Sequence, residues 1–372
     1  MRWSELGGSS PPTTRTPTFA LAYATADVPL HSLTFAPETL VVGCTSSGGV
    51  FTPRGYLRGA HALFFDEADG VDVGVAGMPT TAENAREFAA EAARQIATQL
   101  GRAPDTLLLH GTPGYEERLL EGISDAFGGQ PPPVYGGSAA DDDLSGKWRV
   151  RVGTETFSEG FALAGFASKR VVHGGFVAGY LPGPQRAVVT AVEGRRVFTL
   201  DGEPAAEVYN RWRGNDLADV MGKEAVVLAR TTLHPLGREV DRVGRVARYL
   251  LSHPHAVHAD GSMSFFTEFA VGDSLTMMMG SLGSLLERTD QVVHRALHGD
   301  RTQSLRGGIL VYCGGCVMAL GDKTAEVAGL FSKAVGGAPF LGAATFGEVG
   351  CFPGPSAVNR HGNLMCDVVL FG

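Results

Sequence analysis

The sequence predicts a two-domain protein of the α/β to α+β class, in which repeated strand–helix–strand units build mixed sheets. Apolar runs of strand length alternate with amphipathic segments of helix length. Three segments far apart in the chain share one plan, in which a strand, a helix and a second strand end in a turn of small residues. A chain of 372 residues is long enough for two such domains.

The first unit spans residues 18–51, TFALAYATADVPLHSLTFAPETLVVGCTSSGGVF. Its two apolar runs are predicted strands, and the connection between them leaves the helix curtailed or missing. The second strand runs into a turn of small residues from Cys44 to Gly49. Residues 1–16 have no long apolar core, so we expect a flexible leader there.

A long amphipathic helix is predicted over residues 80–101. Thr80 and Glu83 have the spacing of a capping box. Apolar residues recur at every fourth position from Phe88 to Leu100, which places them on one face. Gly101 is typical of a helix end.

The second unit follows over residues 105–143. DTLLLHG is a predicted buried strand and YEERLLEGISDAFGG a helix with one apolar face. PPPVYGGSAADDD holds a strand that ends in the turn from Gly136 to Ser138. Strands joined through a helix favour parallel pairing.

The third unit, residues 306–352, repeats the plan. GGILVYC is a strand, the helical part ends at Gly336 and Gly337, and FLGAATFGEVG closes on a turn from Ala343 to Gly347. Between the second and third units the chain is rich in strands. It includes two strands across a Glu-Gly turn, a helix starting near Pro204, and a helix in SLLERTDQVVHRAL.

Pro and Gly in YLPGPQR indicate a domain boundary near residues 180–186, which divides the chain into domains over 17–183 and 184–372. The net charge of −8 and the lack of a Lys/Arg run argue against nucleic acid or an anionic membrane as partner. No apolar run is long enough to cross a bilayer. Five widely spread cysteines favour a reducing, cytoplasmic setting.

LVVGCTSSGGV and PVYGGSAADDD resemble the N-terminal half of the FIST proteins. VTAVEGRRVFTLDGEPAAEVY, HPLG, LVYCGGC and FLGAATFGEVG resemble the C-terminal half, in the family order from about residue 17 to the end. The resemblance implies a sensory module for small molecules such as amino acids. Some bacterial members of the family resemble haem-binding nitric oxide sensors that modulate a kinase. The chain departs from the family in its first helix and in CGGCVMAL, where the usual Arg is missing.

The three turns are the candidate ligand site, because glycines and small polar residues at strand ends offer hydroxyls and main-chain N–H donors. Glu348 is the acidic group best placed to orient a ligand amine or to act as a general base. A small-residue turn or an exposed carboxylate would explain the same pattern. The predicted ligand-binding residues are Cys44, Thr45, Ser46, Ser47, Gly48, Gly136, Gly137, Ser138, Tyr312, Thr345, Phe346 and Glu348.

Cys313 and Cys316 form a Cys-x-x-Cys pair after a strand, which is compatible with inert core thiols, redox or nucleophilic chemistry, or half of a zinc site. The three acids at residues 141–143 are more typical of a solvated turn than of a cation site, and no metal site is assigned. For a haem sensor the candidate ligands are His110, His234 and the cluster His253, His255 and His258, which we expect in a solvated loop.

The leading hypothesis is a cytoplasmic sensor that binds a small polar ligand, amino-acid-like or a carboxylate, and signals through a separate protein. The alternatives are an enzyme with Cys313 as nucleophile and Glu348 as base, and a haem-binding gas sensor. No cofactor other than haem is suggested.

Overall fold

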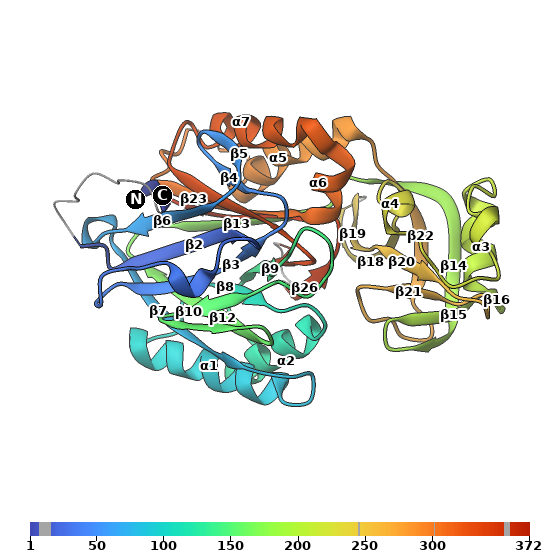
Figure 1. Ribbon diagram of the computed structural model, residues 1–372, viewed down its shortest axis with the longest axis horizontal. Coiled ribbons are helices and arrows are strands. Elements are labelled where there is room, and N and C mark those ends of the chain that lie inside the picture. The colour runs from blue at the N-terminus through green and yellow to red at the C-terminus, as the bar shows by residue number, and fades with distance from the viewer. Residues whose placement is uncertain (7–15, 245, 301, 353–357) are drawn as a thin grey trace.

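The computed structural model describes residues 1–6, 16–244, 246–300, 302–352 and 358–372. Figure 1 shows a large body and a smaller lobe, joined where the chain leaves the body at Leu181 and returns after Met279. The body combines both ends of the chain and carries three sheets. The small lobe is built from the intervening segment. The fold is of the predicted mixed α/β type.

The first sheet of the body contains the first predicted unit. β2 (Phe19–Thr25) and β3 (Leu40–Ser46) pair in parallel, joined through the short 3₁₀ helix η1 (Leu30–Ser32) in place of a full helix, as expected. The order of the strands is β1 (Arg2–Leu6), β6 (Ala60–Phe65), β2 (Phe19–Thr25), β3 (Leu40–Ser46), β10 (Val150–Val152) and β11 (Glu155–Phe157).

Residues 2–6 correct the prediction of a flexible leader. They form the edge strand β1, antiparallel to β6, so this part of the leader is ordered by main-chain hydrogen bonds. The N-terminal amine also pairs with Asp69 at 2.7 Å. The rest of the predicted leader, apart from residue 16, lies outside the described residues.

The second sheet contains the second unit. β8 (Thr106–Gly111) and β9 (Val134–Ser138) pair in parallel and are connected by helix α2 (Glu116–Ala126), and α1 (Ala85–Leu100) packs beside α2 on the same face. Another 3₁₀ turn, η2 (Glu67–Asp69), precedes β7. The order is β26 (Asn359–Gly362), β25 (Glu348–Cys351), β9 (Val134–Ser138), β8 (Thr106–Gly111), β12 (Gly160–Ser168) and β7 (Val71–Pro79).

The predicted start of the first long helix is wrong by about one turn. Asn84, rather than Thr80, occupies the N-cap position, and its Oδ1 accepts hydrogen bonds from the hydroxyl of Thr80 and the amide of Thr81. The predicted end is confirmed, because Gly101 caps α1 in the left-handed conformation.

The third sheet contains the third unit. β23 (Gly307–Cys313) and β24 (Phe340–Thr345) pair in parallel. They are connected by α6 (Gly314–Leu320), η4 (Gly321–Lys323) and α7 (Thr324–Ala334), and α5 (Leu282–Ala296) packs beside α7. The order is β13 (Val172–Val177), β27 (Cys366–Phe371), β23 (Gly307–Cys313), β24 (Phe340–Thr345), β4 (Val50–Thr52) and β5 (Gly55–Leu57).

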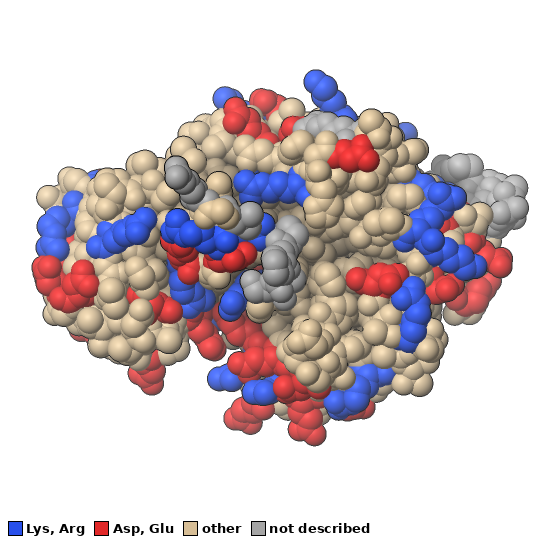
Figure 2. Space-filling model, turned by 180° about the vertical axis from the view of Figure 1, so that it is seen from behind, with Lys and Arg blue, Asp and Glu red and all other residues tan. Residues whose placement is uncertain are grey.

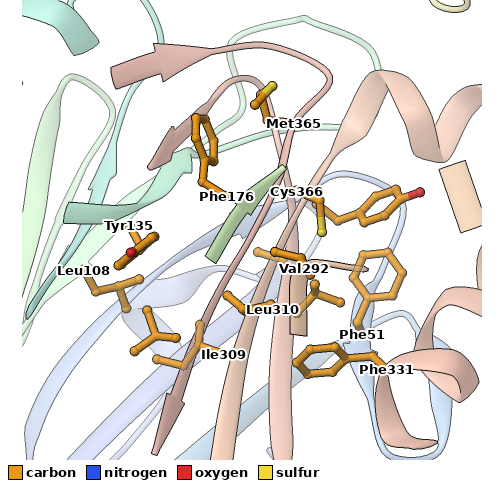
Figure 3. Close-up of a cluster of buried hydrophobic side chains, with 14 of the residues drawn as sticks. Phe51, Leu108, Tyr135, Phe176, Val292, Ile309, Leu310, Phe331, Met365 and Cys366 are labelled. Carbon is orange, nitrogen blue, oxygen red and sulfur yellow. The ribbon is translucent and has the colours of Figure 1, made fainter. Parts of the chain in front are cut away.

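The inner faces of the sheets meet in one large core, because successive strand residues point to opposite faces. Leu108 and Tyr135 of the second sheet point into this core (Figure 3), whereas Leu107 and Leu109 pack outward against α1 and α2. The three sheets are thereby fixed against each other by apolar burial.

The small lobe is a twisted antiparallel sheet with two short helices, α3 (Ala205–Trp212) and α4 (Leu228–Thr231), and the 3₁₀ turn η3 (Ala218–Val220). The predicted helix near Pro204 is confirmed as α3. The strand order is β17 (Ala225–Val226), β20 (Pro254–Val257), β21 (Met263–Phe265), β15 (Arg196–Leu200), β14 (Leu181–Glu193), β22 (Ser274–Met279), β18 (Leu236–Val243) and β19 (Val246–Ser252), with β16 (Glu203–Pro204) paired to β15.

No helix in the described part of the chain has the length and apolar character that a membrane crossing requires.

Gly122 tests how closely α1 and α2 pack. A Cβ at this position would lie 2.0 Å from the main-chain oxygen of Arg86, so we expect Gly122→Ala to push the helices apart and lower the free energy of unfolding by about 1–3 kcal/mol. Gly329 of α7 is a matched helical control with no atom within 4 Å, and Gly329→Ala should stabilise by up to about 1 kcal/mol. Urea unfolding measures both. Equal effects would contradict the described packing.

Candidate functional site

The first and third turns lie against each other at the ends of their strands. The amide of Ala344 donates to Ser46 Oγ at 2.7 Å, and the amide of Ser47 donates to the carbonyl of Ala344 at 3.0 Å. The Ser46 hydroxyl in turn donates to the carbonyl of Gly49 at 2.5 Å. One serine side chain therefore links the two turns.

The second turn joins the third in the same way. The amide of Ser138 donates to the carbonyl of Gly347, and the amide of Phe346 donates to the carbonyl of Ser138, both at 3.0 Å. Ala140 then donates to the carbonyl of Thr45 of the first turn, also at 3.0 Å. The three turns converge, as the sequence suggested.

Glycine is required where these backbones approach most closely. Gly136 has a φ of +134°, and a Cβ there would lie 2.0 Å from the carbonyl oxygen of Leu109. A Cβ on Gly137 would lie 2.4 Å from the carbonyl oxygen of Gly347. Both glycines thus allow protein backbones to touch one another.

The convergence changes the role of the main-chain donors. The amides of Ser47 and Ser138 are used between turns, and the amide of Gly48 donates to Asp142 Oδ1 at 2.6 Å. These N–H groups were expected to hold a ligand. Because they already have protein acceptors, they hold the turns together instead.

A pocket of about 510 Å³ opens between the large body and the small lobe, and we call it the junction pocket. The large body contributes residues of the first and third turns and the start of α6. The small lobe contributes residues of β17 and α4 and their neighbours. Its lining consists of Ser47, Gly48, Asp142, Asp143, Leu144, Val226, Leu228, Ala229, His253, Phe266, Cys313, Gly314, Gly315, Val317, Met318, Thr345, Phe346, Gly347 and Asn363.

Only some of the predicted residues reach this pocket. Ser47, Gly48, Thr345, Phe346 and the thiol-bearing Cys313 line it. The remaining ones are buried behind its wall or in the sheets and are not among its lining residues: Cys44, Thr45, Ser46, Gly136, Gly137, Ser138, Tyr312 and Glu348.

The pocket wall is mainly apolar, with Leu228, Phe266 and Met318 among its larger side chains. Neither Lys nor Arg is among its described lining residues. Of the two acids at the mouth, Asp142 is already paired with Arg58 at 3.1 Å. The pocket therefore suits a largely uncharged molecule.

His253 lines the junction pocket, although the sequence predicts a solvated loop for this residue. It is fully buried just before β20, and its Nε2 donates to the carbonyl of Leu228 at 3.0 Å. Burial lowers the pKa of His253 to about 3, so the ring is neutral and Nδ1 is left as an acceptor. Nδ1 lies beside Gly315 in the pocket wall, 3.4 Å from where a Cβ on that glycine would be.

Glu348 lies behind the pocket wall, with no exposed surface. Its carboxyl oxygens accept from Thr345 Oγ1 and from the amide of Met365, both at 2.9 Å. Burial raises the pKa of Glu348 to about 8. The geometry does not present Glu348 to a substrate beside Cys313, as the enzyme hypothesis requires, and it makes the residue a structural link between β25 and the third turn.

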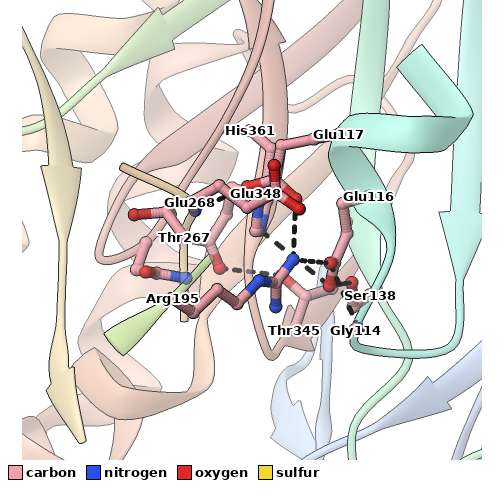
Figure 4. A network of polar contacts seen from close by, with 12 residues as sticks. Gly114, Glu116, Glu117, Ser138, Arg195, Thr267, Glu268, Thr345, Glu348 and His361 are labelled. Atoms are coloured by element: carbon pink, nitrogen blue, oxygen red, sulfur yellow. Dashed lines mark hydrogen bonds and ion pairs between the residues drawn. The ribbon is translucent and has the colours of Figure 1, made fainter. Parts of the chain in front are cut away.

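A buried polar network below the pocket connects the two lobes (Figure 4). Arg195, from the β14–β15 hairpin of the small lobe, donates through Nη2 to Glu116 and Glu117 at the start of α2, at 2.7 Å in each case. Glu117 also accepts from His361 Nδ1 at 2.9 Å, and from the amide of Glu268 of the small lobe at 3.2 Å. We call these four side chains, Arg195, Glu116, Glu117 and His361, the interlobe network.

The charges of the interlobe network balance. Burial alone would raise the pKa values of Glu116 and Glu117, but His361 and Arg195 hold both below the ordinary value. Burial alone would lower the pKa of His361, but the two carboxylates raise it. Two anions thus face a guanidinium and an imidazolium.

Glu116, Glu117 and His361 of the interlobe network have their possible metal-ligand atoms within 4.8 Å of one another, which is close enough to hold a metal ion. Arg195 already places a positive charge between the carboxylates, and a second cation there would be repelled. We therefore interpret the cluster as an ion-pair network. No sequence pattern predicts this network, because its members come from three segments far apart in the chain: the start of α2, the β14–β15 hairpin and β26.

A second hollow, the basic cleft, of about 800 Å³, lies at the lobe junction on the opposite face, where Figure 2 shows basic side chains gathered. Its lining includes no Asp or Glu among the described residues. Burial and the neighbouring Arg248 lower the pKa of Arg295. The basic groups of its lining are Arg186, Arg242, Arg248, Arg295, His294 and His298.

The other predicted haem ligands are placed differently. His110 is buried with both ring nitrogens engaged, by the hydroxyl of Tyr23 at 2.8 Å and the carbonyl of Gly137 at 3.0 Å. His258 bonds to Glu224 and Ser264. His234 and His255 are not among the lining residues of either hollow.

Two family models match the chain. The model of the FIST N domain matches residues 19–203, and the model of the FIST C domain matches residues 205–351. No curated protein matches the chain. The first match extends past Leu181 into the small lobe, so the two family domains and the two lobes divide the chain at different points.

Removal of Arg195 tests the interlobe network. Arg195→Gln leaves buried carboxylates without their guanidinium, and we expect it to lower the free energy of unfolding by about 3–5 kcal/mol. The next residue is a matched control, because Arg196 pairs with Asp260 near the surface, and Arg196→Gln should cost about 1 kcal/mol or less. Urea unfolding measures the loss of unfolding free energy in both variants. Similar losses would show that Arg195 is not held in the described network.

The raised pKa of Glu348 predicts a pH dependence of stability. The folded protein holds this proton up to about pH 8, whereas the unfolded chain releases it near its ordinary pKa of 4.5. The stabilising effect of the proton is complete below pH 4.5 and is lost as the pH rises toward 8. Glu348→Gln should therefore gain stability relative to the wild type between pH 5 and pH 8 in urea unfolding. A difference that is constant over this range would contradict a neutral Glu348.

Proposed function

The chain belongs to the FIST family of sensory domains, and we propose that it is a sensor whose small-molecule ligand binds in the junction pocket. The observation that carries the proposal is that both lobes line this pocket. The large body contributes Cys313, Gly314, Gly315, Val317, Met318 and residues 345–347, and the small lobe contributes Val226, Leu228, Ala229, His253 and Phe266. A ligand that contacts both walls favours one arrangement of the lobes.

The pocket wall indicates the class of ligand. Its apolar side chains suit an apolar body, and a volume of about 510 Å³ is in the range of small-molecule sites. Asn363 and the neutral His253 offer a few hydrogen-bonding groups. We propose a ligand with an apolar body and one or two uncharged polar groups, such as an N-acetylated apolar amino acid amide. A free carboxylate finds no cation among the described lining residues.

The output of the sensor is proposed to be read by a separate signalling protein in the cytoplasm. The two sensory domains account for residues 19–203 and 205–351, so within this stretch the signal is a change of shape or surface. The five cysteines are free thiols, which is typical of a reducing compartment.

A second candidate function is haem binding in the basic cleft. Haem would supply an iron that binds a diatomic gas. His294 at the end of α5 and His298 just beyond it offer imidazoles, and arginines such as Arg186 and Arg295 suit propionate groups. Aromatic rings of the lining, those of Phe176, Tyr249 and Phe352, suit a porphyrin face. A Soret band on adding haemin to the colourless protein is the expected result, and its absence removes this candidate.

Filling the junction pocket tests the leading proposal. We expect at least one of N-acetylleucinamide, N-acetylphenylalaninamide and indole to raise the melting temperature of the wild type, and Ala229→Trp to abolish the shift because the tryptophan ring occupies the pocket. Ala259 is an exposed alanine of the small lobe outside the pocket lining, and Ala259→Trp should keep the shift.

Two results would contradict the proposal: a shift that persists in Ala229→Trp, or no shift with any of the three compounds in folded wild-type protein. Succinate is the charged comparison compound. We expect it to cause no melting-temperature shift in the wild type that Ala229→Trp abolishes.

A further inference from the structure

Cys313 and Cys316 form a dithiol in the wall of the junction pocket. β23 ends at Cys313, which is the N-cap residue of α6, and Cys316 lies in the first turn of that helix. The two thiols are close enough for one to hydrogen-bond to the other. Cys313 lines the pocket with 4% of its surface exposed, whereas Cys316 is fully buried behind it.

A buried guanidinium lies next to this pair. Arg288 of α5 has no exposed surface, and its charged group stacks on the Tyr312 ring at 4.1 Å. Nη1 donates to the carbonyl of Leu364 at 2.6 Å and to that of Ala178 at 3.2 Å. Nε and Nη2 have no hydrogen-bond partner among the described residues. Arg288 therefore has no carboxylate partner and needs a buried anion.

Several acidic groups near Arg288 compete to be that anion. Burial raises the pKa values of Tyr312, Cys366 and Glu348, that of Glu348 to about 8, so all three favour the neutral form. Burial also acts against a Cys316 thiolate, but the Cys313 thiol and the Arg288 charge together lower the pKa of Cys316 to about 6. Cys316 is thus the acidic group beside Arg288 whose anionic form is favoured, and the hydroxyl of Tyr180 lies 3.7 Å from its Sγ.

We propose that Cys313 and Cys316 are a redox-active pair that a peroxide oxidises to a disulfide, and that Arg288 is the positioning residue that holds Cys316 as the reacting thiolate. The thiolate is the nucleophile in such chemistry. Cys316 has no exposed surface, so a small oxidant must reach its Sγ from the junction pocket past Cys313, where Gly314 and Gly315 carry no side chains. This inference uses the pocket's geometry and is independent of its proposed ligand.

The reaction balances in two steps. The Cys316 thiolate attacks one peroxide oxygen, an S–O bond forms, the O–O bond breaks, and the released hydroxide takes a proton to become water. Cys313 then loses its proton and attacks Cys316 Sγ; the S–S bond forms, the S–O bond breaks, and hydroxide leaves as a second water. Two thiols are oxidised by two electrons, and one hydrogen peroxide is reduced to two waters.

The first experiment treats the reduced full-length protein with equimolar hydrogen peroxide at pH 7, removes the peroxide, then alkylates the protein in denaturant, which exposes all five buried cysteines, and digests it for mass spectrometry. We expect the peptide that carries residues 313–316 to lose two hydrogens and resist alkylation until a dithiol reductant is added. Cys44, Cys351 and Cys366 should remain alkylatable. Cys313→Ser should stop the reaction at a sulfenic acid on Cys316, trapped by dimedone. Full alkylation of both cysteines after peroxide would overturn the proposal.

The second experiment tests Arg288 through the pH profile of the oxidation rate. The wild type should reach half of its maximal rate near pH 6, Arg288→Lys should stay close to it, and Arg288→Met should move the midpoint upward and slow the reaction at pH 7 by at least about tenfold. A wild-type midpoint near pH 9 would overturn the role of Arg288 even if Arg288→Met does not fold. A pH profile of the oxidation rate that is unchanged in folded Arg288→Met would also overturn the role of Arg288.

Discussion

Parallel pairing of two strands in each repeated unit is the constraint on which the rest of the structure depends. It brings the turns after β3, β9 and β24 to one place, where their main chains hydrogen-bond to each other. The side chain of Ser46 and the main chain of Ser138 supply hydrogen bonds that join the turns. Because these bonds use the polar groups of the turns, the turns form a rigid wall, and the side chains that project from it decide what can bind.

The small lobe turns this wall into a pocket. It is held against the large body by the interlobe network, in which Arg195 crosses from one lobe to the carboxylates of the other. A buried charge network is satisfied only in a narrow range of geometries, so it fixes the position of the lobe. The junction pocket lies nearby and is lined by both lobes, which gives a ligand contact with both parts of the molecule.

The sequence predicts those parts of the structure that depend on local pattern. The three parallel units, the glycine end of α1 and the short connection at Leu30–Ser32 follow from apolar periodicity and glycine placement. The sequence does not reveal how polar groups are shared across long distances. Glu348 reads as a pocket carboxylate because it ends an apolar strand, yet Met365 and Thr345 enclose it. The sequence predicts a solvated loop for His253, yet this residue is buried and hydrogen-bonded to Leu228 and Asn363.

Amide hydrogen exchange, resolved to single residues by NMR, tests the convergence of the turns most directly. If the three strand ends are bonded to one another, the amides of Ser47, Ser138, Ala344 and Phe346 exchange as slowly as those in the middle of β8 or β23, although they lie outside regular ladders or at their ends. Exchange of these four amides at the rate of freely exposed loops would contradict a shared wall and, with it, the pocket built on it.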